Sequence, residues 1–219
     1  MTKAAIPNVL LDLDGTLTDP ARGFVSCMRH ALDTLGVPSP ADKQIASHIG
    51  PPLEETLKQL LGPAASKSLP DAVRLYRERY ADVGIFENSL YDGVVDALET
   101  IAAKGPRMFL ATSKPQTFAK KILEHFSLSA FFTGIYGSQF DGTYSDKREL
   151  LAYLLKHEAI APSQAIMVGD RYHDIRAARS NNIRSLGVLW GYGSKAELIS
   201  AKADHIISCP SHLPDAVFI

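Results

Sequence analysis

The chain has 219 residues, of which 46% are hydrophobic and 21% are charged, a composition typical of a globular protein with an ample core. Lysine and arginine total 23 and aspartate and glutamate total 24, so the formal net charge is −1 and gives no general reason to expect nucleic acid or an anionic membrane as a partner. Two cysteines are too few for a disulfide scaffold, and no secretory or membrane segment is found. We therefore expect a cytoplasmic enzyme or binding protein.

Four short apolar runs have the pattern of strands that are buried on both faces. They are residues 9–11, 108–111, 165–168 and 183–189. Between them, apolar residues repeat at helical spacing over 94–102, 118–126 and 150–155. Pro115 is expected in the first turn of the second of these helices, and Asp146 is expected to cap the third. Strands that alternate with helices predict an α/β fold with a doubly wound parallel sheet.

The segment from about residue 21 to residue 85 has a different pattern. Its apolar residues repeat at helical spacing and it contains no strand-like run, which predicts an all-helical insertion after the first strand. Gly50-Pro51-Pro52 marks a break between two of its helices. We expect a larger α/β domain formed by residues 1–17 and 87–219, and a second, smaller helical domain formed by residues 18–86.

Polar side chains follow three of the predicted strands, and ligands of open parallel sheets bind outside the carboxyl ends of the strands. The residues in question are Asp12, Asp14, Thr112, Ser113, Asp170 and Asp174, with Lys147 at a predicted helix start. Two carboxylates about 4 Å apart repel each other by about 4 kcal/mol at an effective dielectric near 20, so such a cluster requires a cation. Oxygen ligands of this kind suit Mg²⁺, which commonly bridges to a phosphate.

Four motifs of the sequence resemble those of the haloacid dehalogenase superfamily of phosphohydrolases. They are residues 12–18 (DLDGTLT), residues 110–113 (LATS), Lys147 and residues 169–174 (GDRYHD). Their order and their positions after strands or at a helix start make the combination specific. The resemblance implies a Rossmann-like core, and the helical insertion looks like the cap domain of the phosphoglycolate phosphatase and β-phosphoglucomutase branch.

The resemblance also implies residue roles. Asp12 would attack phosphorus, and Asp14 would protonate the leaving alkoxide and later activate water. Thr112 and the N–H groups of Leu13, Asp14 and Ser113 would hold the phosphoryl group, and Lys147 would neutralise its charge. The Mg²⁺ ligands would be Asp12, the backbone carbonyl of Asp14, Asp170 and Asp174. The turn at Gly50 would reach toward the substrate.

Together these features predict a Mg²⁺-dependent phosphomonoesterase that acts through an aspartyl-phosphate. Its substrate would be a small phosphate ester, similar to 2-phosphoglycolate or a nucleoside 5′-monophosphate, and the protein would be a monomer or a homodimer. The alternatives are a β-phosphoglucomutase-like phosphotransferase, a phospho-accepting signalling module and a metal-free dehalogenase. The turn after Gly50 carries no charged side chain, which disfavours the mutase.

Some residues have a second interpretation. Lys114 is a rival of Lys147 for the phosphate. Thr112 and Ser113 could cap the following helix, and Asp174 could cap its own helix. His173 is expected to be a solvated loop or helix residue.

Overall fold

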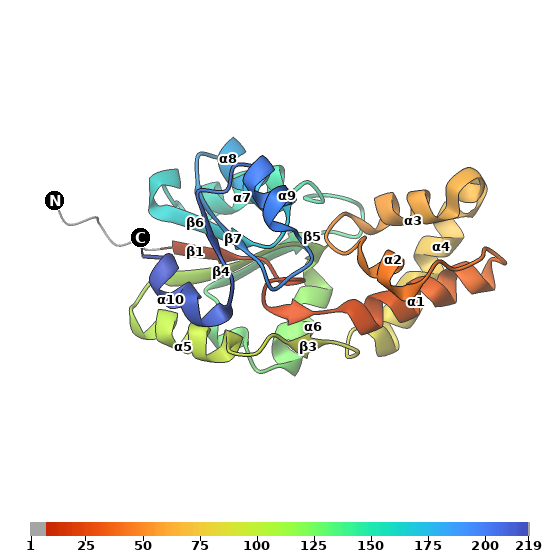
Figure 1. Ribbon diagram of the computed structural model, residues 1–219, viewed down its shortest axis with the longest axis horizontal. Helices are drawn as coiled ribbons and strands as arrows, with labels where there is room; N and C mark the ends of the chain where they lie inside the picture. The colour runs from red at the N-terminus through yellow and green to blue at the C-terminus, as the bar shows by residue number, and fades with distance from the viewer. Residues whose placement is uncertain (1–7, 219) are drawn as a thin grey trace. The chain divides into compact units, whose positions relative to one another are not determined.

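The computed structural model describes residues 8–218, with only the backbone described for residues 64–66. The chain forms two compact units, one of Met1–Thr18 with Leu90–Ile219 and the other of Asp19–Ser89. The chain passes between them at β2 (Thr18–Asp19) and β3 (Ser89–Leu90), which pair as a two-stranded sheet. Figure 1 labels most of the elements of both units.

The first unit contains a six-stranded parallel sheet in the order β5-β4-β1-β6-β7-β8. The strands are β1 (Asn8–Leu11), β4 (Arg107–Pro115), β5 (Gly134–Ser138), β6 (Ala165–Gly169), β7 (Arg184–Val188) and β8 (His205–Ile207). In the central strand, Leu10 lies opposite Phe109 of β4 and Met167 of β6. The side chains that follow β1 are therefore flanked by the ends of β4 and β6. The predicted α/β fold with a parallel sheet is confirmed.

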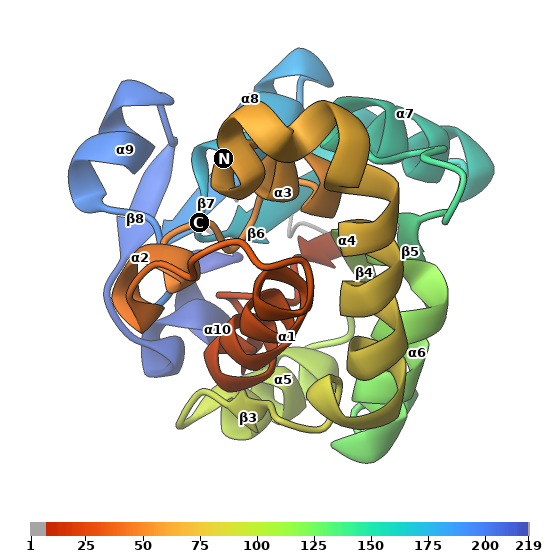
Figure 2. The same ribbon diagram turned by 90° about the vertical axis from the view of Figure 1, so that its right-hand side faces the viewer.

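Helices cover both faces of this sheet. They are α5 (Val94–Ala103), α6 (Gln116–His125), α7 (Lys147–His157), α8 (Tyr172–Ser180), α9 (Lys195–Ser200) and α10 (Leu213–Ala216), with short 3₁₀ turns at Ser129–Phe131, Pro162–Gln164 and Pro210–His212. Helices α7 and α8 lie on one face and α5, α6 and α10 on the other, as Figures 1 and 2 show. Because strand side chains alternate between faces, Leu10 and Phe109 pack with Leu154 of α7 in one core cluster.

Of two predicted helix starts, that of α6 differs in detail from the structure and that of α7 is confirmed. Strand β4 continues through Pro115, with a shift in register between Thr112 and Pro115, so α6 begins after the proline rather than containing it in its first turn. The residue before a proline favours extended backbone, which accounts for the longer strand. Asp146 caps α7 as predicted, and its carboxylate accepts from the N–H of Arg148, the second residue of the helix.

The second unit consists of helices joined by short turns. They are α1 (Ala21–Thr34), α2 (Asp42–Ala46), α3 (Leu53–Leu61) and α4 (Ala65–Arg79), with a 3₁₀ turn at Gly62–Ala64 and a π-helical turn at Tyr80–Gly84. Helix α4 packs against both α1 and α3, and Met28, Leu57 and Tyr76 are buried. Arg79 pairs with Glu87 at 2.8 Å. Gly50 lies in the connection between α2 and α3, as the Gly-Pro-Pro motif predicts.

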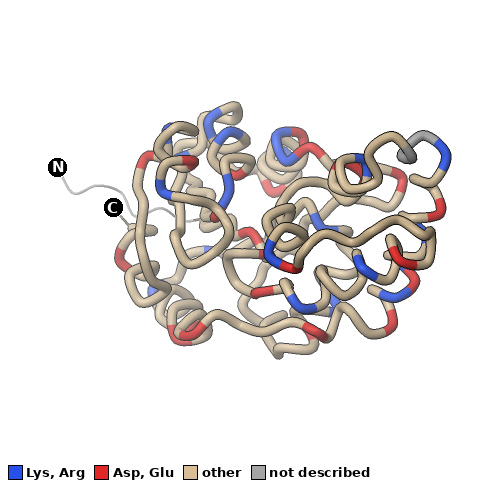
Figure 3. The backbone as a smooth tube through the Cα atoms, turned by 45° about the vertical axis from the view of Figure 1, so that its right-hand side comes forward, with Lys and Arg blue, Asp and Glu red and all other residues tan. Residues whose placement is uncertain are grey.

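The charged residues of both signs are interspersed along both units (Figure 3). None of the helices within residues 8–218 has both the length and the apolar composition that crossing a membrane requires. Neither Cys27, which is buried, nor Cys209, which is partly buried, takes part in a disulfide bond.

Candidate functional site

Asp12 lies directly after the central strand at the carboxyl edge of the sheet. Its N–H donates to the carbonyl of Val168 at 3.0 Å, so the ladder with β6 continues one residue beyond β1. Its Oδ1 accepts from the N–H of Leu13 at 2.8 Å, and the residue is only 7% exposed. Backbone pairing therefore fixes where this carboxylate stands.

Three buried carboxylates meet at this edge. Asp170 follows β6 and Asp174 lies in the first turn of α8. One oxygen from each of Asp12, Asp170 and Asp174 lies within 4.8 Å of the other two. Because β1 and β6 are parallel neighbours, their carboxyl ends bring residues together that are far apart in the sequence. The structure thus places three of the predicted metal ligands in one cluster.

Asp170 is enclosed by backbone, and glycines make this possible. Its Oδ2 accepts from the N–H of Tyr192 at 2.7 Å. Gly15 has φ +81°, and a Cβ there would lie 2.3 Å from this same oxygen. A Cβ on Gly191 would lie 2.4 Å from it. The close approach of these two loops to Asp170 therefore requires glycine at both positions.

Gly191 and Tyr192 were not among the residues expected at the site. They follow β7, and Trp190 beside them donates its indole N–H to the carbonyl of Thr16 at 2.9 Å. The sequence carries a weak signal for them, since Trp190-Gly191-Tyr192-Gly193 follows a predicted strand of the same sheet. This contact shows that the loop after β7 also belongs to the edge on which the acids meet.

Lys147 is the ammonium group of the cluster. Its Nζ lies 2.9 Å from Oδ2 of Asp12 and 2.5 Å from Oδ1 of Asp174, and its side chain is almost fully buried. Burial lowers the pKa of Lys147, but the two carboxylates outweigh this and raise it above its usual value. The group is therefore a fixed positive charge at neutral pH, shared between two acids.

The acids outnumber this cation. Burial, together with the neighbouring carboxylates, raises the pKa of Asp170 well above its usual value, and burial raises the pKa of Asp174 to about 6. Oδ1 of Asp170 is buried and has no hydrogen-bond partner within the described part of the chain. A buried polar oxygen without a partner is costly, and an ion would satisfy it. The donor set of three carboxylates is one that could hold a hard divalent cation.

Asp14 has a cation of its own. Its Oδ2 lies 2.6 Å from Nζ of Lys114. Burial raises the pKa of Asp14, and the charge of Lys114 opposes this shift. The other oxygen, Oδ1, is buried and makes no hydrogen bond to any residue that the structure describes. The sequence left open whether Lys147 or Lys114 lies at the site. Both do: Lys147 contacts Asp12, and Lys114 contacts Asp14.

Thr112 and Ser113 lie at the end of β4, beside β1. Thr112 is buried, and its Oγ1 accepts from the N–H of Lys114 at 3.3 Å. Within residues 8–218, no side chain makes a capping hydrogen bond at the start of α6, so the capping interpretation of these two residues is wrong. Gly50, the remaining predicted contact, belongs to the helical unit, and its role stays a prediction.

Two further predictions about the fourth motif can be compared with the structure. Asp174 does cap its helix, because its Oδ2 accepts from the N–H of Arg171 at 3.0 Å, while its other oxygen contacts Lys147. The expectation of a solvated His173 is wrong: the residue is partly buried, with Nε2 fully so. Burial, followed by the charges of Lys147 and Arg171, lowers the pKa of His173 to about 4, so it is neutral at pH 7.

Comparison with known proteins links this geometry to a family. The model of the haloacid dehalogenase-like hydrolases matches residues 9–188. The chain is 40% identical over 199 residues to a 5′-nucleotidase of Pseudomonas aeruginosa, a match that covers 91% of this chain and 90% of that protein. It is 39% identical over 201 residues to the tyrosine-protein kinase PtkA of Mycobacterium tuberculosis, covering 91% of this chain and 67% of that protein.

Solved structures agree with the sequence comparison. A crystal structure described as a predicted phosphatase from Clostridium acetobutylicum superposes with a TM-score of 0.92 at 34% identity, covering 98% of this chain and 99% of that one. The family match extends from β1 to β7 and so includes Asp12, Lys147 and Asp170. This chain therefore belongs to the haloacid dehalogenase-like hydrolase family.

Proposed function

We propose that this protein is a Mg²⁺-dependent phosphomonoesterase that hydrolyses a small phosphorylated metabolite through an aspartyl-phosphate. One observation carries the proposal: Asp12, Asp170 and Asp174 converge with Lys147 in a buried cluster at the carboxyl edge of the sheet. Such a cluster supplies a nucleophile and the charges that a phosphate dianion requires. Phosphoryl transfer needs little beyond alignment and charge neutralisation.

In the first step, a carboxylate oxygen of Asp12 forms a bond to phosphorus while the bond from phosphorus to the ester oxygen breaks. The leaving alkoxide takes a proton from the carboxyl group of Asp14 and departs as an alcohol. In the second step, Asp14 accepts a proton from water, and the water oxygen attacks the same phosphorus. The Asp12–phosphorus bond then breaks and inorganic phosphate is released. A carboxylate nucleophile thus divides one difficult hydrolysis into two easier steps.

The remaining residues of the site bind the phosphoryl group in this proposal. Lys147 already contacts Asp12 and would neutralise charge on the transferring group. Thr112, at the adjacent strand end, would donate its hydroxyl, together with the N–H groups of Leu13, Asp14 and Ser113. Donors fixed by backbone need no reorganisation during the reaction, which is the most effective form of electrostatic stabilisation.

The acid cluster fits Mg²⁺ as its cofactor. Asp12, Asp170 and Asp174 would hold the ion, with the carbonyl of Asp14 as a further oxygen ligand. Oδ1 of Asp170, which has no hydrogen-bond partner among the described residues, supports this assignment. When bound, Mg²⁺ supplies a positive charge that offsets the negative charge of the phosphate and of the acids.

The same cluster predicts how stability depends on pH and metal. In EDTA, the free energy of unfolding should fall as pH rises through about 4 to 6, because the folded state keeps Asp174 protonated to a higher pH than the unfolded state does. Mg²⁺ should therefore raise the melting temperature more at pH 7.5 than at pH 5. Thermal melts at both pH values, with and without about 5 mM Mg²⁺, measure this difference in the melting temperature. Ca²⁺-free buffer with sodium chloride at matched ionic strength is the control, and equal shifts at the two pH values would contradict the assignment.

The direct test of the proposed function is turnover of a panel of phosphate esters with and without metal. We expect hydrolysis of 4-nitrophenyl phosphate and of at least one metabolite among 2-phosphoglycolate, nucleoside 5′-monophosphates and sugar phosphates. EDTA should stop the reaction and added Mg²⁺ should restore it. Activity that survives complete chelation would remove the metal from the proposal, and a failure to hydrolyse any ester would overturn it.

Among the proposed substrates we favour nucleoside 5′-monophosphates, because the chain is 40% identical to a 5′-nucleotidase. We assign the choice of leaving group to the helical unit, which is inserted between the first and second motifs. Its turn at Gly50-Pro51-Pro52 offers backbone rather than charged side chains. A turn without charged side chains is better suited to a neutral part of the substrate than to a second phosphate. A mutase that acts on a hexose bisphosphate would need to bind such a second phosphate.

The similarity to PtkA favours a second candidate, transfer of the phosphoryl group to a tyrosine hydroxyl. Both candidates would use an aspartyl-phosphate, and they differ in the phosphoryl donor, a small ester or ATP, and in the group that accepts phosphorus, water or a tyrosine hydroxyl. Incubation with γ-labelled ATP and a tyrosine-containing protein, followed by measurement of labelled phosphate and labelled tyrosine, separates them. We expect no label on tyrosine, together with release of inorganic phosphate from unlabelled small esters in parallel reactions, whereas label on tyrosine would favour the second candidate.

A further inference from the structure

We propose that Lys114 is a positioning residue that holds the carboxyl group of Asp14 where it can protonate the leaving group. The inference rests on the proposed function, because it assigns Asp14 to proton transfer. In this role Lys114 acts through Asp14 and does not contact the phosphoryl group. Loss of Lys114 would then slow formation of the aspartyl-phosphate only with those substrates whose leaving groups need a proton.

The contact between the two side chains is short and sheltered. Nζ of Lys114 lies 2.6 Å from Oδ2 of Asp14, and the side chains are 9% and 19% exposed. Lys147 is differently placed, since it contacts Asp12 and Asp174. An ion pair that is largely removed from water is held more firmly than one on the surface.

The geometry leaves the second oxygen of Asp14 for chemistry. Oδ2 is held by Lys114, while Oδ1 is buried and has no hydrogen-bond partner among residues 8–218. A carboxyl group that is anchored through one oxygen presents the other in a fixed direction. General acid catalysis depends on that direction as well as on the acid itself.

The backbone that carries Lys114 is itself tied to the neighbouring strand. The register of β4 with β5 shifts between Thr112 and Pro115, so Lys114 lies in an irregular stretch. Ser138 donates its hydroxyl to the carbonyl of Ser113 at 2.8 Å. Gly137 approaches so closely that a Cβ on it would lie 2.6 Å from the carbonyl oxygen of Lys114. Strand β5 thus supports the residue from one side.

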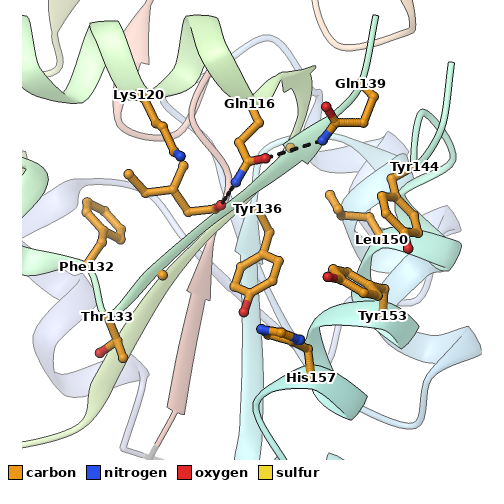
Figure 4. Close-up of a pocket in the computed structure, with 13 residues that line it drawn as sticks. Gln116, Lys120, Phe132, Thr133, Tyr136, Gln139, Tyr144, Leu150, Tyr153 and His157 are labelled. Atoms are coloured by element: carbon orange, nitrogen blue, oxygen red, sulfur yellow. Dashed lines mark hydrogen bonds between the residues drawn. The ribbon is translucent and has the colours of Figure 1, made fainter. Parts of the chain in front are cut away.

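Gln116 fixes the backbone on the C-terminal side of the irregular stretch between Thr112 and Pro115. Figure 4 shows its side chain at a pocket of about 390 Å³ beside β5, where its Nε2 donates to the carbonyl of Ile135 at 2.6 Å. Its Oε1 accepts from Nε2 of Gln139 at 3.3 Å, drawn as the second dashed line. Ser113 and Gln116 are both hydrogen-bonded to residues of β5, so the backbone on either side of Lys114 is held in place. Irregular strand segments of this kind commonly direct a side chain into a site.

Leaving groups separate the two roles that Lys114 could have. An alkoxide is a poor leaving group and needs a proton as its bond to phosphorus breaks, whereas 4-nitrophenolate is stable enough to leave without one. A residue that acts through Asp14 therefore matters for alkyl phosphates. A residue that binds the phosphoryl group matters for both kinds of ester equally.

The experiment compares kcat/KM for the best alkyl phosphate of the panel with kcat/KM for 4-nitrophenyl phosphate, since this ratio reports the steps up to formation of the aspartyl-phosphate. Lys114→Met should lower the first by about 100-fold, a typical value for loss of general acid catalysis, and the second by about 3-fold or less. Lys114→Arg should recover part of the loss. Lys120→Met is the matched control, because Lys120 is exposed on α6 and faces the pocket of Figure 4.

A double mutant completes the test. In an Asp14→Asn background, Lys114→Met should cost less than about 3-fold with the alkyl ester, because the group that it positions is gone. Equal losses for both esters, or full additivity of the two substitutions, would overturn the inference while leaving the phosphatase proposal intact. If Lys114→Met does not fold, Lys114→Gln replaces it. Absence of any ester hydrolysis by the wild-type protein would instead be a failure of the proposed function.

Discussion

Replacement of Asp12 by asparagine is expected to abolish ester hydrolysis while leaving the fold intact. The amide has nearly the same shape as the carboxylate but is not a nucleophile, so the aspartyl-phosphate cannot form. The substitution also removes one negative charge from a cluster in which acids outnumber Lys147, which limits any loss of stability. We expect kcat with 4-nitrophenyl phosphate to fall by more than about 100-fold.

The measurement needs a fold control and a substitution control. Circular dichroism and a melting temperature within a few degrees of wild type, about the shift that 1 kcal/mol produces, would show that the variant folds. Asp92→Asn makes the same chemical change at an exposed position and should leave kcat unchanged. Retention of more than about one hundredth of wild-type activity by Asp12→Asn would argue against its role as nucleophile.

Replacement of Lys147 by methionine should have the largest combined effect on stability and activity. The change leaves Asp12 and Asp174 buried without their shared cation. Loss of one partner from a buried ion pair typically costs about 3–5 kcal/mol of unfolding free energy. Because burial raises the pKa of Asp174, this acid takes up a proton at low pH, and the loss should be smaller at pH 5 than at pH 7.5.

Denaturant unfolding at the two pH values measures this loss, and kcat/KM with 4-nitrophenyl phosphate should fall by about 100-fold, as for removal of one preorganised donor. Arg148→Met is the matched control. It is the next residue of α7, its side chain is 63% exposed, and its ion pair with Asp146 lies at the surface. We expect it to cost less than about 1 kcal/mol. Similar losses in the two variants would mean that Lys147 is not a buried counterion.

Much of the fold and of the acid cluster can be predicted from the sequence, for a clear physical reason. Strands that are buried on both faces give continuous apolar runs, and polar residues directly after such a run stand at the edge of the sheet. Asp12 and Asp170 satisfy this rule, and the structure places their oxygens together. The motif positions of Asp174 and Lys147 then follow from the family resemblance rather than from periodicity.

The contacts that could not be predicted depend on tertiary geometry. Nothing in the local sequence indicates that the N–H of Tyr192 reaches Asp170, since the contact depends on how the loop after β7 lies. The choice between Lys114 and Lys147 was unresolvable because the register shift in β4 decides where Lys114 points. A polar side chain next to acids looks exposed in a sequence, but the environment of His173 at the start of α8 buries its Nε2.

The position of β1 in the sheet has a consequence for biosynthesis. Both of its partners are made later, since Leu10 pairs with Phe109 and Met167, and the whole helical unit is translated in between. An apolar strand whose partners are translated later stays unpaired until they have been made, and pairings between distant segments form slowly. The helical unit has its own packed helices and is free to fold during that delay. The strand that leads into Asp12 therefore gains its first sheet partner only after the whole helical unit and β4 have been translated.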